Sequence, residues 1–278
     1  TVFYIKKKTA QRFDKLFFDI CKKISVKNFI DCGANVGTSS LDAINVGLNV
    51  LAIEPNPHSF KNMLLNPSEQ FKKINVGLSD KEDVLKFYIL KNINTATNAS
   101  FLVPRNNLNK YDIIEVPVIP LDKLINDSKI IDHLFSLWVD VEGMEKEFLT
   151  GALEILKNNN CVLIKIEYTK KINSSDQSFS RDEIEYFLND LGYEAIYRDF
   201  EYSIAYNIMF IKRDYVTPLK IEIDDAFTDI AKNINILNVS KHLIGYFKTK
   251  IKKKIKKIII KILGVRLGNI IASYFGSE

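Results

Sequence analysis

Two short stretches of the chain carry residue types that could bind a nucleotide-like ligand. Residues 31–38 read Asp-Cys-Gly-Ala-Asn-Val-Gly-Thr, and Glu54 ends the next apolar run. Because apolar residues also precede Asp31, the pattern predicts a strand, a glycine turn, a helix and a second strand that ends in an acid. In such a unit the glycines let a ligand approach the backbone, and the acid accepts hydrogen bonds from ribose hydroxyls.

The glycine spacing argues against a dinucleotide. A dinucleotide-binding turn has the pattern G-x-G-x-x-G, whereas here three residues separate Gly33 from Gly37. A pyrophosphate prefers bare backbone N–H groups at a helix N-terminus, so Asp31 at the entrance would repel it. The same carboxylate could attract an ammonium group. The turn therefore favours a cofactor that joins an adenosyl group to an amino acid, and an ordinary strand–helix connection with incidental glycines is the alternative.

A second acidic motif, Asp140-Val141-Glu142-Gly143, follows the apolar run 134–139. Asp140 would end a strand at the carboxyl edge of the sheet, where ligands bind in open α/β folds. Glu167 lies near the end of an apolar run that we expect to form the adjacent strand. Carboxylates there could align a hydroxyl group and take its proton, which makes Asp140, Glu142 and Glu167 the candidate catalytic residues.

Two other interpretations of these acids stay open. Asp140, Glu142 and Glu167 could together hold Mg²⁺ or a similar hard cation, because such ions prefer oxygen ligands. Alternatively, Glu142 only favours a helix N-terminus electrostatically, and Glu145 and Glu147 are solvated.

The apolar patterns between these motifs predict the elements that position them. Strands alternate with helices, which is typical of a doubly wound, mostly parallel seven-stranded α/β sheet. Residues 193–197 and 204–212 would form a final strand pair that supplies an antiparallel edge strand. Residues 84–90 and 113–119 would form an extra β-hairpin. Helical spacing predicts helices at about 9–24, 38–46, 57–66, 121–127, 142–157 and 181–191.

A long polar connection, residues 92–109, separates the two strands of the predicted hairpin. It is rich in Asn, Thr and Ser. Connections of this length are either functional or mobile. We expect a lid over substrate or cofactor in which Asn98 and Ser100 contact the ligand, with a mobile surface loop as the alternative.

Length and composition indicate one large domain with appendages. The chain has 278 residues, of which 46% are hydrophobic. We expect a helical segment at 1–26, a cofactor-binding domain at 27–215 and a helical tail at 216–278. The three cysteines, widely spaced and odd in number, argue against a disulfide framework or a zinc site and favour a reducing cytosol. No secretory signal is expected from the first residues.

The tail differs in charge from the rest of the chain. Residues 230–278 hold ten Lys and one Arg against a single acid. From about residue 241, apolar residues recur every three or four positions among the lysines, which predicts a basic amphipathic helix. Such a helix favours an anionic membrane surface, each Lys contributing on the order of 1 kcal/mol. The alternatives are packing on its own domain or in a homo-oligomer, and, less favoured, nucleic-acid binding.

The chain resembles class I S-adenosylmethionine-dependent methyltransferases and, more narrowly, the FkbM family. Six matching motifs occur in the family's order between residues 28 and 168: DCGANVG at 31–37, IEPNP at 53–57, VGLSD at 76–80, VPVIPLD at 116–122, VDVEGME at 139–145 and IEY at 166–168. Met144 stands where the family often has Ala, and Pro120 where Thr is frequent.

The resemblance implies roles for individual residues. Asp31, Gly33 and Asn35 should border the methionine part of S-adenosylmethionine, and Glu54 should hold the ribose. Residues 75–78 should lie beside the adenine. The full set expected around the cofactor is Asp31, Gly33, Asn35, Gly37, Thr38, Glu54, Asn56, Gly77, Leu78 and Asp140.

The resemblance also implies an activity. FkbM proteins methylate a hydroxyl, often on a sugar or glycan, so we expect an O-methyltransferase acting on a glycan that could be lipid-linked or part of an envelope polysaccharide. The alternatives are methylation of an RNA ribose or of another small molecule, and a protein of the same fold that binds a membrane or nucleic acid without turnover. We expect the protein in the cytoplasm, with the tail placing it on the inner face of a membrane.

Overall fold

The computed structural model describes residues 2–91, 99–104, 107–125, 129–169, 180–198 and 205–220. The chain divides into two compact units, and the larger one, Lys6–Ala226, carries both sheets. The tail predicted to form a basic amphipathic helix from about residue 241 lies outside the described residues. The division into segments 1–26, 27–215 and 216–278 stays a prediction.

Within the described residues, seven strands form the larger sheet, in the order β10-β11-β9-β8-β1-β2-β3. In this sheet β1, β2, β3, β8 and β9 are parallel, and of the strands that the structure describes only β11 runs antiparallel to the strands on both sides of it. This confirms the α/β fold with a mostly parallel sheet. The strands are β1 (Asn28–Cys32), β2 (Asn49–Ile53), β3 (Phe71–Ile74), β8 (Phe135–Val139), β9 (Cys161–Thr169), β10 (Tyr193–Arg198) and β11 (Ala205–Lys212).

The prediction of an antiparallel edge strand is wrong in its position. The antiparallel strand β11 lies between β9 and β10, and β10 forms the edge. In this position β11 pairs with a strand on each side, so its backbone polar groups are satisfied. Its residues Ile208–Ile211 are buried.

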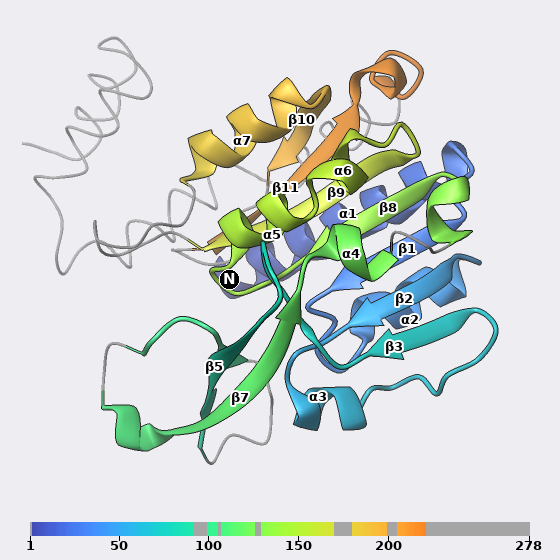
Figure 1. Ribbon diagram of the computed structural model, residues 1–278. Helices are drawn as coiled ribbons and strands as arrows, with labels where there is room; N and C mark the ends of the chain where they lie inside the picture. The colour runs from blue at the N-terminus through green and yellow to red at the C-terminus, as the bar shows by residue number, and fades with distance from the viewer. Residues whose placement is uncertain are drawn as a thin grey trace, which may run out of the picture. The chain divides into compact units, whose positions relative to one another are not determined.

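Helices cover both faces of this sheet (Figure 1). The helices α5 and α6 lie in front of it in this view and α1 behind it. The described α-helices are α1 (Val2–Lys23), α2 (Thr38–Asn45), α3 (Pro57–Lys61), α4 (Leu121–Ile125), α5 (Glu145–Gly151), α6 (Leu153–Lys157) and α7 (Arg181–Asp190), with 3-10 turns at Leu108–Lys110, Lys129–Asp132 and Arg213–Tyr215. Among these residues, no helix is both long enough and apolar enough to cross a lipid bilayer.

Alternate residues of the central strands point to opposite faces of the larger sheet, and each face has its own apolar core. Ile30 and Cys32 of β1 belong to the main hydrophobic cluster, which also holds residues of α5, α6 and α7. Phe29, which points the other way, lies with Phe17 and Phe18 of α1 and with Trp138 in a group of aromatic rings 5.2–6.1 Å apart. The parallel strands are therefore buried from both sides, as their nearly continuous apolar sequences predict.

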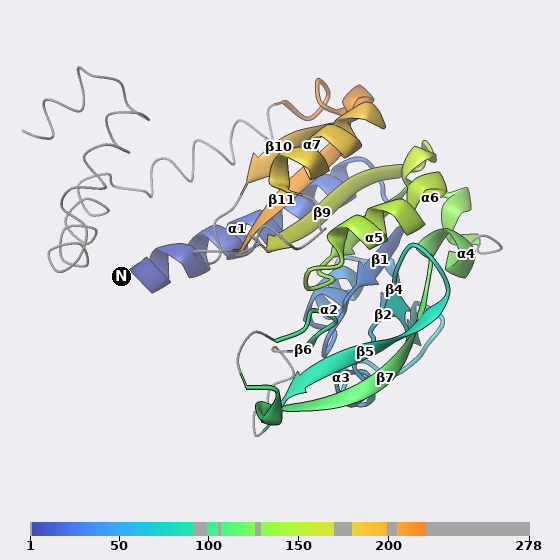
Figure 2. The same ribbon diagram turned by 60° about the vertical axis from the view of Figure 1, so that its left-hand side comes forward.

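A smaller sheet of four strands has the order β4-β7-β5-β6. Its strands are β4 (Gly77–Leu78), β5 (Asp83–Leu90), β6 (Ala99–Ser100) and β7 (Tyr111–Ile119). β5 and β7 pair antiparallel from Asp83 opposite Val118 to Leu90 opposite Tyr111. Figure 2 shows these two long strands running beside each other, away from the larger sheet. Because β4 follows β3 closely along the chain, the smaller sheet starts beside the carboxyl end of β3.

Candidate active site

The candidate site is a pocket at the carboxyl edge of the larger sheet. Strand β1 has β2 on one side and β8 on the other, so the order in which successive strands are added to the sheet changes direction at β1. Ligands of open α/β sheets bind at such a point. The pocket is open to solvent, and its empty space, counted together with the solvent at its mouth, is about 580 Å³. Its walls are Gly33, Asn35, Ile53, Glu54, Pro55, Val76, Leu78, Phe87, Ala99, Phe101, Asp140, Val141 and Glu142.

The glycine turn after β1 allows the backbones of two loops to touch. Gly33 has φ +88°, and a Cβ atom there would lie 1.8 Å from the carbonyl oxygen of Asp140. The N–H of Asp140 in turn donates to the carbonyl of Cys32 at 2.8 Å. Gly37, at φ +81°, is the N-cap of α2. Only a residue without a side chain fits at Gly33, so the turn is shaped by the loop after β8.

Asp31 lies underneath this turn. Its side chain is completely buried, and its Oδ2 accepts hydrogen bonds from the hydroxyls of Ser39 and Ser40, both at 2.6 Å. Burial raises the pKa of Asp31, and the two hydroxyls oppose that shift. The carboxylate does not line the pocket, so the structure places it as an anchor for α2, whereas its predicted role beside the methionine part of a cofactor stays a prediction.

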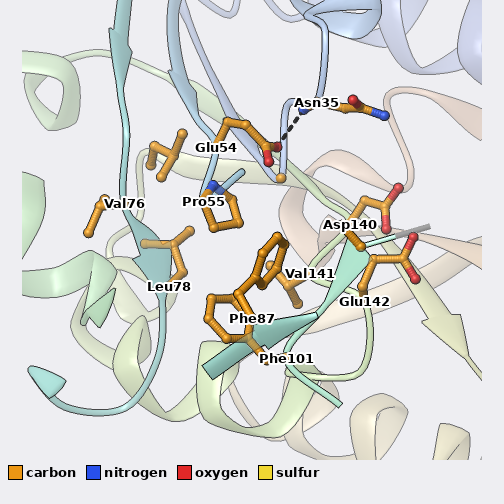
Figure 3. A pocket seen from close by; sticks show the side chains of 13 residues that line it. Asn35, Glu54, Pro55, Val76, Leu78, Phe87, Phe101, Asp140, Val141 and Glu142 are labelled. Atoms are coloured by element: carbon orange, nitrogen blue, oxygen red, sulfur yellow. Dashed lines mark hydrogen bonds between the residues drawn. The ribbon is translucent and has the colours of Figure 1, made fainter. Parts of the chain in front are cut away.

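Glu54 forms one wall of the pocket and organises the turns around it. Its two carboxylate oxygens accept the N–H groups of Asn35 and Asn56, each at 2.7 Å, and the first of these bonds is drawn in Figure 3. Burial, and more weakly the charges of Asp31 and Asp140, raise the pKa of Glu54 to about 7. A ribose would find here an acceptor that is already held in place.

The polar atoms of the pocket suit S-adenosylmethionine. The Oδ1 atom of Asn35 is buried at the pocket wall without a hydrogen-bond partner among the described residues. Such an acceptor fits the ammonium group of an amino acid, and the Glu54 carboxylate fits the ribose hydroxyls. The residues present therefore fit the cofactor that the sequence predicts.

Four other predicted cofactor residues do not line the pocket: Gly37, the N-cap of α2 described above, and Thr38, Asn56 and Gly77. Thr38 is exposed at the start of α2. Asn56 caps α3, its Oδ1 accepting the N–H of His58 at 3.0 Å. Gly77 leaves room for Phe101, whose Cζ would lie 2.6 Å from an added Cβ. Leu78, in contrast, contributes to the wall directly.

The remaining wall is apolar, and part of it was not predicted from the sequence. Val76 and Leu78 lie on one side of the pocket in Figure 3, and the rings of Phe87 and Phe101 lie below. The centroids of the two rings are 4.7 Å apart in an edge-to-face arrangement. Phe87 comes from β5, and Phe101 directly follows β6, so the smaller sheet closes the pocket. A flat aromatic group such as adenine suits such a wall.

Carboxylates gather at the opposite end of the pocket. Asp140 and Glu142 lie beside each other there, away from Val76 and Leu78 (Figure 3). Taken as a whole residue, Glu142 is exposed, but protein atoms surround much of its carboxyl group. This partial burial raises the pKa of the carboxyl well above its ordinary range. The charges of Asp140, Glu145 and Glu54 raise it further.

The interpretation that Glu145 and Glu147 are solvated is wrong for Glu145. Its side chain is only 1% exposed, and its Oε1 accepts the N–H of Gly143 at 3.0 Å. Burial is the main cause that raises its pKa to about 7. A buried acid at the start of α5 has no apolar signature in the sequence, which is why the sequence did not reveal it.

Of the three candidate catalytic acids, Asp140 and Glu142 line the pocket and Glu167 does not. Glu167 lies on β9 opposite Asn207 of β11 and is not part of the pocket wall. Among the described residues, no group of three or more His, Cys, Asp or Glu side chains is arranged to hold a metal ion. Asp140, Glu142 and Glu167 therefore do not form the predicted Mg²⁺ site here.

Of the two residues predicted to contact a ligand from the lid, the structure describes one. Asn98 lies outside the described residues. Ser100 is in β6, and its hydroxyl donates to the carbonyl of Glu142 at 2.8 Å. The structure thus ties Ser100 to the acidic end of the pocket, and its contact with a ligand stays a prediction.

Comparison with known proteins places this site in a family. None of the curated proteins matches the chain. Solved structures with weak similarity include a putative RNA methyltransferase from Pyrococcus horikoshii (13% identity, 72% of this chain and 83% of that one, TM-score 0.38). A second is the magnesium protoporphyrin IX methyltransferase from Synechocystis PCC 6803 with bound S-adenosylmethionine (10% identity, 74% and 79%, TM-score 0.41). Similarity at this level says nothing about the substrate of this chain.

The family model gives the stronger result. The methyltransferase FkbM domain matches residues 31–195, which include both glycine turns, Glu54 and the acidic end of the pocket. More than half of the chain is covered, and all the residues that line the pocket lie within the match. The chain therefore belongs to the FkbM family of S-adenosylmethionine-dependent methyltransferases.

Proposed function

We propose that this methyltransferase methylates a hydroxyl group of a sugar or glycan. The acceptor would enter at the acidic end of the pocket, next to Asp140 and Glu142, while the cofactor occupies the space between Glu54 and the apolar wall. When bound, S-adenosylmethionine supplies a methyl group on a positively charged sulfur. That methyl group would pass to the hydroxyl oxygen of the acceptor with the sulfur as the leaving group, and a carboxylate of the protein would take the hydroxyl proton.

Glu142 is the group proposed to take that proton, and Asp140 the group that orients the hydroxyl. A general base works best when its pKa lies near the working pH, and the raised pKa of Glu142 moves it in that direction. Asp140 lies on the same side of the pocket and raises that pKa by its charge. The observation that carries the proposal is this pair of carboxylates at one end of a pocket whose other end suits an adenosyl group.

The choice of acceptor follows from the family and from charge. FkbM proteins commonly modify sugar hydroxyls, and the residues lining the pocket in the described part of the chain include three acids and no Lys, Arg or His. Such a lining favours a neutral hydroxyl compound over a phosphate-rich one, because like charges repel in a partly desolvated site. A ribose hydroxyl of RNA is the runner-up acceptor, and its methylation is an outcome of the test below.

The acceptor test uses the full-length protein with labelled S-adenosylmethionine and fractionated cell glycans, lipids and RNA, with and without EDTA. We expect label in the glycan or lipid-linked glycan fraction in both conditions. Label confined to RNA would overturn the sugar proposal. Loss of transfer with EDTA would restore the metal prediction.

The residue test compares Glu142→Gln with Asp140→Asn. Each should lower turnover by about 10²–10⁴-fold, because Glu142 is the proposed general base and Asp140 orients the attacking hydroxyl. Cofactor affinity, measured by calorimetry, should stay close to that of the parent. Glu154→Gln, on an exposed side chain of α6, is the matched control. Full turnover in both variants would show that the carboxylates are not the catalytic groups.

We also propose that the basic tail brings the enzyme to an anionic membrane surface, where a lipid-linked glycan would lie. The sequence supports this by the ten Lys among residues 230–278. Flotation with anionic liposomes, full-length protein against a chain that ends at residue 229, tests it. Equal flotation of the two proteins would contradict the proposal. Flotation that depends on added RNA would favour the nucleic-acid alternative.

A further inference from the structure

The turn that carries Glu142 has an unusual backbone. Glu142 has φ +47° and Gly143 has φ +94°, both in the left-handed region. Glycine adopts this region freely, but a glutamate does so only when surrounding contacts hold it. Such strain is common where a side chain must be aimed at a ligand. Two contacts hold the Glu142–Gly143 turn.

One contact comes from the helix that follows. The buried carboxylate of Glu145 accepts the N–H of Gly143 at 3.0 Å. This bond fixes the C-terminal half of the turn to the start of α5. It leaves the carbonyl of Glu142 to be held from elsewhere.

The second contact comes from the smaller sheet. The hydroxyl of Ser100 donates to the carbonyl of Glu142 at 2.8 Å and accepts the N–H of Leu102 at 3.0 Å. The side chain of Leu102 then sits against Gly143, where a Cβ atom would come within 2.2 Å of Leu102 Cδ1. A hydrogen bond and an apolar contact thus fasten residues 100–102 onto the turn.

The same segment forms part of the cofactor pocket. Ala99 and Phe101, on either side of Ser100, both line it. A shift of this segment would therefore move the pocket wall and the Glu142 turn together. Ser100 is the one side chain in the segment with a hydrogen bond to the turn among those that the structure describes.

We propose that Ser100 is a positioning residue for methyl transfer, which holds the Glu142 carboxylate at the acidic end of the pocket through the carbonyl of Glu142. This inference rests on the proposed role of Glu142 as the proton acceptor. It assigns Ser100 a task in the reaction without contact to the reacting atoms.

The pH dependence of turnover gives a readout specific to this role. The charged groups that face Glu142 are Asp140 at the end of β8, Glu145 on α5 and Glu54 at the end of β2, and no charged residue of β6 faces it. All three are acids and raise the pKa of Glu142, as does its partial burial. If the turn loosens, the Glu142 carboxyl becomes more hydrated and moves away from the three acids, so its pKa falls toward the ordinary value. Because the base must be ionised, the acidic limb of the pH–rate profile then moves to lower pH.

The experiment compares Ser100→Ala with Ser100→Thr. The alanine variant loses the hydroxyl, so turnover should fall by about 10–100-fold, as expected for a misplaced catalytic group. Its acidic limb should move to lower pH, and KM for the cofactor should change much less than kcat. The threonine variant keeps a hydroxyl and should recover most of the turnover and the original limb.

Ser180→Ala is the matched control. Ser180 caps α7 in a capping box with Glu183, far along the chain from the pocket, so its loss should lower stability alone and leave the pH profile unchanged. Parent-like turnover and an unshifted limb in Ser100→Ala would overturn the inference if Glu142→Gln is impaired. If Glu142→Gln is itself fully active, the proposed function of Glu142 fails instead, so the two failures are distinguishable.

Discussion

Two turns that meet at the candidate site look alike in sequence but differ in what they do with their acids. Each follows a central strand, β1 or β8, and each contains a glycine with φ near +90°. The first turn begins after Asp31, which is completely buried. The second begins with Asp140, which lines the pocket together with Glu142. The carboxylate of the first turn is therefore buried, whereas the second turn places two carboxylates at the pocket.

The strand register explains the difference. Asp31 is still inside the sheet, where it pairs with Ala52 on one side and Trp138 on the other. Its side chain must point to a covered face, and α2 covers it. Asp140 follows Val139, the last paired residue of β8, so it lies beyond the sheet, next to Gly33. In the register of β1 against β8, Asp140 lies two positions beyond Asp31, and this shift decides whether the acid anchors a helix or faces a ligand.

The largest expected effect comes from forcing the two turns apart with Gly33→Ala. The new Cβ would lie 1.8 Å from the carbonyl oxygen of Asp140, and φ +88° is unfavourable for alanine. Overpacking and strain together should cost on the order of 3 kcal/mol of unfolding free energy, measured by urea denaturation. Cofactor binding should be lost because the pocket wall moves.

Gly47→Ala is the control for backbone strain alone. Gly47 has the same φ of +88°, but an added Cβ would meet nothing within 4 Å. This variant should lose about 1 kcal/mol and bind cofactor normally. Equal losses in the two variants would mean that the contact between the turns is not what requires glycine at position 33.

The second prediction uses the buried acid behind the second turn. Burial raises the pKa of Glu145 from 4.5 to about 7. The folded state then binds this proton more tightly than the unfolded state does, so its contribution to stability is complete below pH 4.5 and is lost as pH rises through about 7. Glu145→Gln removes this loss and should gain up to about 3 kcal/mol relative to the parent between pH 4.5 and 8.

Urea unfolding of both proteins at a series of pH values measures that difference. The glutamine keeps an amide oxygen for the N–H of Gly143, so the turn itself should survive. Glu154→Gln, on an exposed side chain, should give a difference from the parent that stays nearly flat with pH. A flat difference for Glu145→Gln as well would mean that Glu145 is hydrated in solution.

Local patterns were enough to predict the parts of the site that lie along one strand–turn–helix unit. The apolar runs before Asp31, Glu54 and Asp140 form β1, β2 and β8, and Gly33 and Gly37 take the left-handed conformations that glycine permits. The same patterns favoured the mostly parallel sheet. These features depend on residues close together in the sequence, which is why a single chain reveals them.

The parts that the sequence did not reveal depend on contacts between distant segments. Phe87 and Phe101 line the pocket only because the smaller sheet folds against the carboxyl edge of the larger one. Glu167 lies inside β9, one residue beyond Ile166, which pairs with Val139, yet it is opposite Asn207 of β11 and does not line the pocket. A strand-end acid thus becomes a site residue only through its neighbours.

The smallest expected effect sharpens the comparison from the side of the first turn. Ser39→Ala removes one of the two hydroxyls that hold Asp31, at 2.6 Å, and leaves Ser40 in place. If Asp31 only anchors α2, the variant should lose about 1 kcal/mol of unfolding free energy, the usual worth of one hydrogen bond. Turnover, cofactor affinity and the pH–rate profile should match the parent, in contrast to Ser100→Ala. A loss of cofactor affinity without loss of stability would instead mean that Asp31 reaches the methionine part of the cofactor, and then the two turns would share one task.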